Sequence, residues 1–148
     1  MSTPELNLKA AHAEVKAEIA RTDTKTGLLL AFVGAVLAGS WTVAKDVPLT
    51  LPAYVAGGLG MGLLVAAAGL LLRSVRPNLR GGHGFPLWAT LTAEQITATL
   101  SADLSADVAN LSRIALAKFT GLKRAVDLTC AGGMLLILAA LLGIGGAA

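Results

Sequence analysis

Three apolar segments constrain the fold of this chain more than any other feature of its sequence, and they comprise residues 27–44, 53–72 and 126–146. A helix that crosses a bilayer needs about 20 consecutive, predominantly apolar residues, and each segment is close to that length. The second segment contains no charged residue, and the third contains only Asp127, at its leading edge, where a carboxylate can still reach water. The sequence therefore predicts an all-α membrane protein with three transmembrane helices rather than a soluble enzyme with buried core helices.

The composition supports a membrane protein, with 55% hydrophobic residues, 14% charged residues and a mean hydropathy of +0.71. The other residues form an N-terminal arm (1–26), a loop (45–52) and a central insert (73–125). The arm and the insert are each too short to bury an independent core of useful size, so we expect them to pack on each other or on a second copy. The sequence thus predicts a single domain, 1–148, that forms a homo-oligomer.

The basic residues predict the orientation of the chain in the membrane. Of the twelve Lys and Arg residues, only Lys45 lies in the 45–52 loop, and the others lie in the arm and the insert. By the positive-inside rule, the N-terminus and the insert are cytoplasmic, whereas the loop and the C-terminus are external. Trp41 and Tyr54 flank the loop at the depth that aromatic side chains prefer. The net charge of +3 and the pI of about 9.4 therefore follow from topology, with the lipid bilayer rather than nucleic acid as the partner.

The arm is predicted to be a helix that continues into the first apolar segment, because no Gly or Pro interrupts residues 6–26. One face follows the a/d pattern of a helix that packs along a single stripe. Its residues recur at alternating spacings of four and three: Leu8, His12, Val15, Ile19, Thr22 and Thr26. The charged residues of the arm occupy other faces, where we expect them to be solvated.

The insert begins with a helix break and ends in a second long helix. Arg76 precedes a proline, which disfavours the α conformation and ends the second membrane helix. Thr92 and Gln95 have the spacing of a capping box and predict the start of a short helix. From Leu104 nothing interrupts the chain, and we expect this helix and the arm to form a cytoplasmic bundle, side by side or antiparallel. One apolar stripe leads into the third segment: Val108, Leu111, Ala115, Phe119, Leu122 and Val126.

The second apolar segment contains a G-x-x-x-G pair formed by Gly58 and Gly62. Such a pair lets two helix backbones approach closely in lipid, where no hydrophobic force drives helices together. The pair also arises by chance in membrane helices. It predicts a packing face either within one protomer or between copies.

No catalytic or metal-binding motif is present, so the sequence predicts a protein that is not an enzyme. The P-loop, G-x-S-x-G and H-E-x-x-H patterns are missing, and the two histidines, His12 and His83, do not have metal-ligand spacing. Asp23 and Asp127 lie near membrane boundaries. They either anchor the helices at the interface, with Asp127 paired to a basic residue one turn earlier, or take part in ion passage.

Lys118 is the charged residue with the least obvious structural explanation, because it lies on the apolar stripe, seven residues after Leu111. It either snorkels to a lipid phosphate or a neighbouring helix, or helps to bind a small anion at the inner membrane boundary. Arginine suits phosphate because its planar fork donates two hydrogen bonds, and an amide can contact a base or sugar edge. The predicted ligand-binding residues are Arg76, Asn78, Arg80, Arg113 and Lys118. Their spacing alone does not require a nucleotide.

Three stretches of sequence also carry a family resemblance. They are the run from Ala11 to Lys25 that leads into Gly27-Leu28-Leu29-Leu30, then Val75-Arg76-Pro77-Asn78-Leu79 with Gly84-Phe85-Pro86, and finally Leu111-Ser112-Arg113-Ile114-Ala115-Leu116-Ala117-Lys118-Phe119. Together and in this order they resemble the small transmembrane effectors of the Pycsar antiphage defence systems. The resemblance covers nearly the whole chain.

The resemblance implies a two-component bacterial defence. A partner pyrimidine nucleotide cyclase makes cyclic UMP or cyclic CMP on phage infection, and the effector in the inner membrane responds with loss of membrane integrity and growth arrest or cell death. The resemblance implies no cofactor besides this activating cyclic nucleotide, and it assigns no ligand-binding residues. Because no soluble ligand domain is recognisable, any pocket has to be built from the two projecting helices and the Pro77 loop, between copies. A ligand-independent, holin-like pore former and a structural membrane subunit are the alternative functions.

Overall fold

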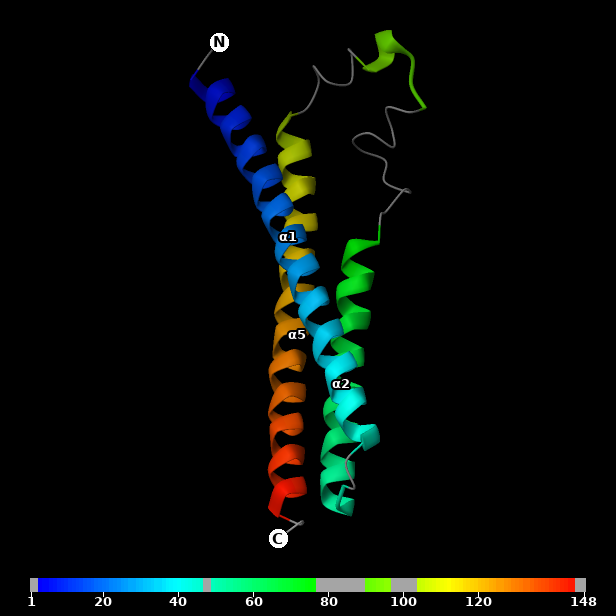
Figure 1. Cartoon of the computed structure of the whole chain (residues 1–148). Coiled ribbons are helices and arrows are strands. Elements are labelled where there is room, and N and C mark those ends of the chain that lie inside the picture. Colours follow the sequence, from blue (N-terminus) through cyan, green and yellow to red (C-terminus); the bar gives the residue numbers. More distant parts are fainter. Residues whose placement is uncertain (1–2, 47–48, 77–89, 97–103, 146–148) are drawn as a thin grey trace. The chain divides into compact units, whose positions relative to one another are not determined.

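The computed structural model describes residues 3–46, 49–76, 90–96 and 104–145. The regular structure within these ranges is helical, and each of the three long helices contains a window that is long and apolar enough to cross a membrane. The helices are α1 (Thr3–Asp46), α2 (Leu51–Val75) and α5 (Leu104–Gly145) (Figure 1). The prediction of an all-α, multi-pass membrane protein is confirmed at this level.

α1 joins the N-terminal arm and the first apolar segment in one helix of 44 residues, as the sequence predicted. Pro4 lies in its first turn, where the backbone N–H groups have no intrahelical acceptor to lose. The helix continues through Gly27 without a break. It ends at Asp46, shortly before Pro48 in the sequence, where the helical conformation becomes unfavourable.

The boundaries of α2 and α5 also agree with the sequence-based ones. The first hydrogen bond of α2 runs from the backbone N–H of Tyr54 to the carbonyl of Thr50, at 2.9 Å. α2 ends at Val75 because Arg76 precedes a proline. α5 begins at Leu104, the position from which the sequence predicted an unbroken helix.

A capping box starts a helical turn in the insert. The Thr92 Oγ1 accepts a hydrogen bond from the backbone N–H of Gln95 at 3.4 Å, and the Gln95 Oε1 accepts one from the backbone N–H of Thr92 at 3.0 Å. The N–H of Ile96 donates to the carbonyl of Thr92 at 2.9 Å and closes the turn. The predicted capping box is confirmed, and the rest of the predicted short helix lies outside the described residues.

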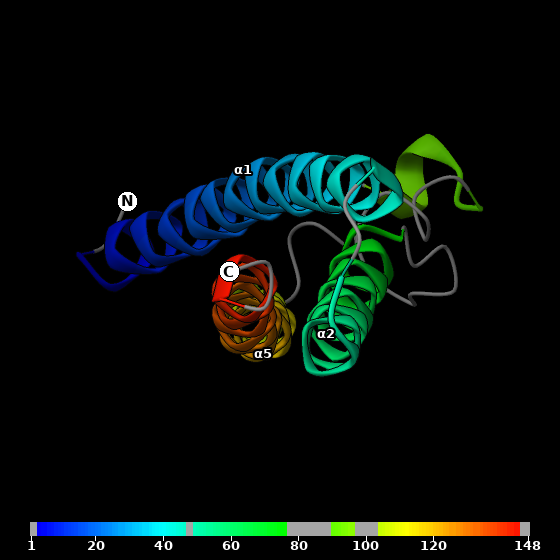
Figure 2. The same ribbon diagram turned by 60° about the horizontal axis from the view of Figure 1, so that its bottom comes forward.

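The contacts of the chain divide into two units. We call the described residues within 1–22 and 76–119 the polar unit, and those within 23–75 and 120–148 the apolar unit. In the polar unit, the first parts of α1 and α5 run in the same direction (Figure 1). In the apolar unit, the remaining parts of α1 and α5 lie beside α2, which runs antiparallel to α5 (Figures 1 and 2).

α1 buries the predicted a/d stripe. In the polar unit the stripe positions are half-buried or buried: Leu8, His12, Val15, Ile19 and Thr22. In the apolar unit the stripe continues through Thr26 and Val33, which are 1% and 0% exposed. Positions 12, 19, 26 and 33 are spaced by seven residues, the repeat of helices that pack with a left-handed crossing.

The stripe of α5 agrees with the predicted one at Val108, Leu111, Ala115 and Leu122, which are half-buried, and differs from it at two positions. Phe119 and Val126 are 36% and 41% exposed, whereas Lys118 is half-buried and Ala125 is 0% exposed. The prediction assumed the period of a straight helix, about 3.6 residues per turn. The less exposed positions instead repeat every seven residues: 104, 111, 118, 125, 132 and 139. On a helix, Lys118 lies only about 20° around the axis from Leu111, whereas Phe119 lies about 80° from it, so a seam that contains Leu111 also contains Lys118.

Glycine permits the closest helix contact in the apolar unit. A Cβ added to Gly60 of α2 would lie 2.9 Å from the carbonyl oxygen of Gly132 on α5, and a Cβ on Gly132 would lie 2.9 Å from the oxygen of Gly60. Small residues let membrane helices approach in this way. Farther along the same antiparallel pair, a Cβ on Gly57 would lie 3.6 Å from the Cβ of Ala139. The core beside the glycine contact contains Leu64, which is 1% exposed.

Gly58 and Gly62 lie on a different face of α2. Both are exposed, and a Cβ on either would meet nothing within 4 Å. Within the described protomer, the close glycine contact is therefore made by Gly60. Of the two predicted alternatives for the G-x-x-x-G pair, packing between copies is the one that this geometry leaves open.

Candidate functional site

Three of the five predicted ligand-binding residues lie in the described part of the chain. Arg76 directly follows α2 and is exposed. Arg113 and Lys118 belong to α5, and all three residues are in the polar unit. Asn78 and Arg80 lie outside the described residues.

Arg113 and Lys118 occupy different faces of α5. They are five residues apart, which corresponds to about 140° around the helix axis and about 7.5 Å along it. Arg113 is exposed, whereas Lys118 is half-buried on the heptad stripe. The prediction that Lys118 lies on the apolar stripe is confirmed. A small ligand that contacts both side chains would need them from two copies of the chain.

Three polar side chains of the polar unit are half-buried, although the sequence did not predict them to lie on the packed stripes. They are Glu18 on α1, and Asp107 and Asn110 on α5. Each directly precedes an apolar stripe residue in the sequence, so these polar side chains lie at the edges of the packed stripes. Together with the half-buried His12, they supply hydrogen-bonding groups along the packed faces of the two helices.

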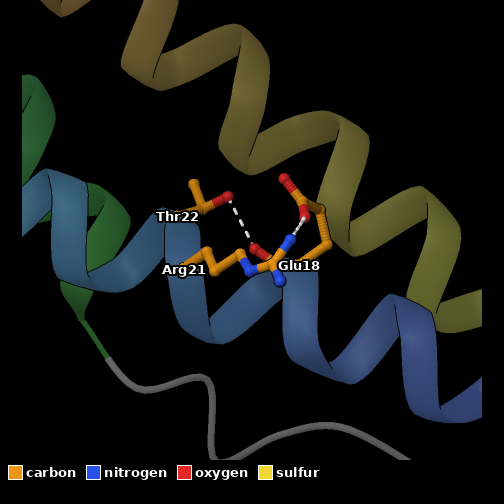
Figure 3. Close-up of polar contacts among 3 residues, drawn as sticks. All are labelled: Glu18, Arg21 and Thr22. Carbon is orange, nitrogen blue, oxygen red and sulfur yellow. Dashed lines mark hydrogen bonds and ion pairs between the residues drawn. The ribbon is translucent and has the colours of Figure 1, made fainter.

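Local contacts order the arm around Glu18 (Figure 3). The Thr22 Oγ1 donates to the carbonyl of Glu18 at 2.8 Å, which provides a partner for a hydroxyl on a residue that is 1% exposed. The Arg21 Nη1 donates to the Glu18 Oε2 at 3.4 Å. The Arg21 side chain is 73% exposed, so this ion pair adds little to stability, about 0.3–0.5 kcal/mol. Arg21 is solvated, as the sequence predicted for the charged residues of the arm, whereas Glu18 is half-buried and departs from that prediction.

The remaining acidic residues do not form a metal site in the part of the chain that the structure describes. No group of three or more His, Cys, Asp and Glu residues there could hold a metal ion. Asp127 is exposed, and among the described residues no ion pair joins it to Lys123 or Arg124. In the described part of the chain, the basic side chains of the polar unit are the groups whose chemistry suits an anion.

Comparison with protein families gives a match over nearly the whole chain. The model of the Pycsar effector protein domain matches residues 7–145, a range that contains all of α2 and α5 and almost all of α1. It also contains every predicted ligand-binding residue. The comparisons with curated proteins and with solved structures gave no match.

Proposed function

The chain belongs to the Pycsar effector family of antiphage-defence membrane proteins, and from this we propose that cyclic UMP or cyclic CMP from a partner pyrimidine nucleotide cyclase activates it. The activated protein impairs the bacterial inner membrane and causes growth arrest or cell death before phage are released. The observation that carries this proposal is the family match, which covers all three apolar helical segments and most of the polar unit. A membrane effector of this kind needs a ligand site but no catalytic centre.

We propose that the ligand phosphate binds basic side chains of the polar unit: Arg76, Arg113 and Lys118, with Asn78 and Arg80 from the adjoining insert. Hydrogen bonds from arginine or lysine to phosphate are charge-assisted and among the strongest that side chains make. Since Arg113 and Lys118 diverge by about 140° around α5, the pocket lies between copies. Lys118 comes from one copy and Arg113 from the next. A homo-oligomer is therefore part of the proposal.

We propose that the N-terminus and the insert face the cytoplasm and that the C-terminus is external. Cysteines at Asp46 and Glu94, which are both exposed, test this orientation in a Cys130→Ser background. In intact spheroplasts, Asp46→Cys should react with a membrane-impermeant thiol reagent, whereas Glu94→Cys should react only after permeabilisation. Equal labelling of the two cysteines before permeabilisation would contradict the orientation and, with it, a cytoplasmic ligand site.

Nucleotide binding is tested by the thermal stability of the purified protein in detergent. A ligand that binds only the folded protein adds about 2.7 kcal/mol of stability at a concentration of 100 times its Kd. We expect cyclic UMP or cyclic CMP to raise the Tm by several degrees, with cyclic AMP as the control. A Tm that responds to none of these nucleotides would instead support a holin-like pore former or a structural membrane subunit.

A further inference from the structure

The apolar unit contains an open groove that is separate from the proposed nucleotide site. Its volume is about 330 Å³, and all three helices line it. The lining includes Gly39 and Val43 of α1, Gly57 and Met61 of α2, and Leu136 and Ala140 of α5. An apolar cavity of about 150 Å³ is enough to hold benzene, so this groove has room for a longer hydrocarbon chain.

The groove exists because two glycines lack side chains and because α1 packs loosely. A Cβ on Gly39 would meet nothing within 4 Å, and a Cβ on Gly57 would meet only the Cβ of Ala139, at 3.6 Å. Only 6% of the apolar window of α1 is buried, compared with 28% for α2 and 22% for α5. The loose packing of α1 therefore leaves space between α1 and its two neighbours in the apolar unit, α2 and α5.

The location and size of the groove favour an acyl chain as its occupant. The groove lies in the helical segments that cross the membrane, where hydrocarbon rather than water is the surrounding solvent. A flexible hydrocarbon chain bends to follow an open groove, whereas a helix of a second copy is a rigid cylinder about 10 Å across. A chain that is one methylene wide fits this space better than a helix of a second copy.

The charged residues beside the groove indicate what kind of lipid carries the chain. The lining reaches Ala44, and the next two residues of α1 are Lys45 and Asp46, which are both exposed. A lysine at the end of a membrane helix attracts a lipid phosphate. The adjacent carboxylate repels a second negative charge and attracts an ammonium group. We propose that the groove binds the acyl chain of a zwitterionic, ethanolamine-type phospholipid, with its phosphate at Lys45 and its ammonium group at Asp46.

Native mass spectrometry of the protein released from mild detergent tests this proposal, which does not depend on nucleotide activation. The protein is reconstituted with equal amounts of phosphatidylethanolamine and phosphatidylglycerol before solubilisation. We expect the wild type to retain phosphatidylethanolamine and Gly39→Leu, which fills the groove, to lose it. Gly34→Leu is the matched control, because Gly34 lies on the same helix, does not line the groove and has nothing within 4 Å of an added Cβ. This control should retain the lipid.

Two further variants keep the test decisive. Met61→Phe fills the groove from α2 and should also lose the lipid, so the test does not depend on the folding of Gly39→Leu alone. Lys45→Gln should lower retention severalfold at an unchanged Tm. Equal retention by Gly39→Leu, Met61→Phe and the wild type would overturn the proposal. So would loss of crosslinking between copies in the groove-filling variants without loss of lipid, because the groove would then hold a second copy.

Discussion

Replacing Gly60 with leucine is expected to destabilise the apolar unit more than any other single substitution considered. A Cβ at this position lies 2.9 Å from a backbone oxygen of Gly132 and 3.2 Å from side-chain atoms of Leu135 and Leu136. A backbone atom cannot move aside as a flexible side chain can, so α2 and α5 have to separate. We expect a loss of about 3 kcal/mol or more, measured as a lower Tm in detergent and a smaller monodisperse fraction in gel filtration.

Gly58→Leu and Gly62→Leu are the matched controls for Gly60→Leu. They make the same change on the same helix, where an added Cβ meets nothing within 4 Å of the described protomer. We expect both variants to keep the Tm of the wild type. If their face joins copies, the double variant should also show weaker crosslinking between copies. A Tm for Gly60→Leu equal to that of these controls would contradict the close contact between α2 and α5.

Neutralising Lys118 is expected to have the largest effect on ligand binding. Lys118→Gln should remove the proposed charge-assisted contact to the ligand phosphate, worth about 1.5–3 kcal/mol or roughly a tenfold to hundredfold loss of affinity. Isothermal titration with the activating nucleotide measures this loss. Lys123→Gln is the control, since Lys123 lies on the same helix but is exposed and off the stripe. If Lys118 only snorkels to lipid, Lys118→Gln will bind nucleotide with wild-type affinity and alter only stability or membrane association.

A mixture of two variants distinguishes a ligand pocket between copies from a ligand pocket within one copy. Arg113→Gln and Lys118→Gln should each weaken binding when pure. In a mixed oligomer, an interface can pair Lys118 from an Arg113→Gln subunit with Arg113 from a Lys118→Gln subunit. Tight binding should therefore reappear for part of the mixed population. If the mixture binds as weakly as its components, the two side chains do not meet across copies.

The sequence predicted the helices well because their boundaries depend on local signals. The arm runs into the first apolar segment since nothing interrupts it, α2 ends before a proline, and the capping box of Thr92 and Gln95 forms as its spacing indicates. Each of these features is decided by residues within a turn or two of one another. No knowledge of the packing was needed.

Features that depend on packing were harder to predict. The α5 stripe includes Lys118, as predicted, but Phe119 and Val126 are 36% and 41% exposed, because helices that pack along one seam follow a heptad repeat. The sequence predicted packing at Gly58 and Gly62 either within one protomer or between copies, and within the described protomer the close contact forms between Gly60 and Gly132. The second apolar segment has glycines on more than one face, and only the position of α5 decides which face is used. The separation of Arg113 from Lys118, in contrast, follows from their five-residue spacing on a helix and needs no knowledge of the packing.

Nucleotide-triggered leakage from liposomes tests the central claim most directly. Liposomes that enclose a self-quenched dye and contain the reconstituted protein are exposed to cyclic UMP, cyclic CMP or cyclic AMP at the same concentration. We predict dye release with a cyclic pyrimidine nucleotide, no release with cyclic AMP, and a shift of the response to tenfold to hundredfold higher nucleotide in Lys118→Gln, as the lost phosphate contact requires. Leakage that depends on the amount of protein but not on any nucleotide would contradict the claim that a ligand activates this membrane effector.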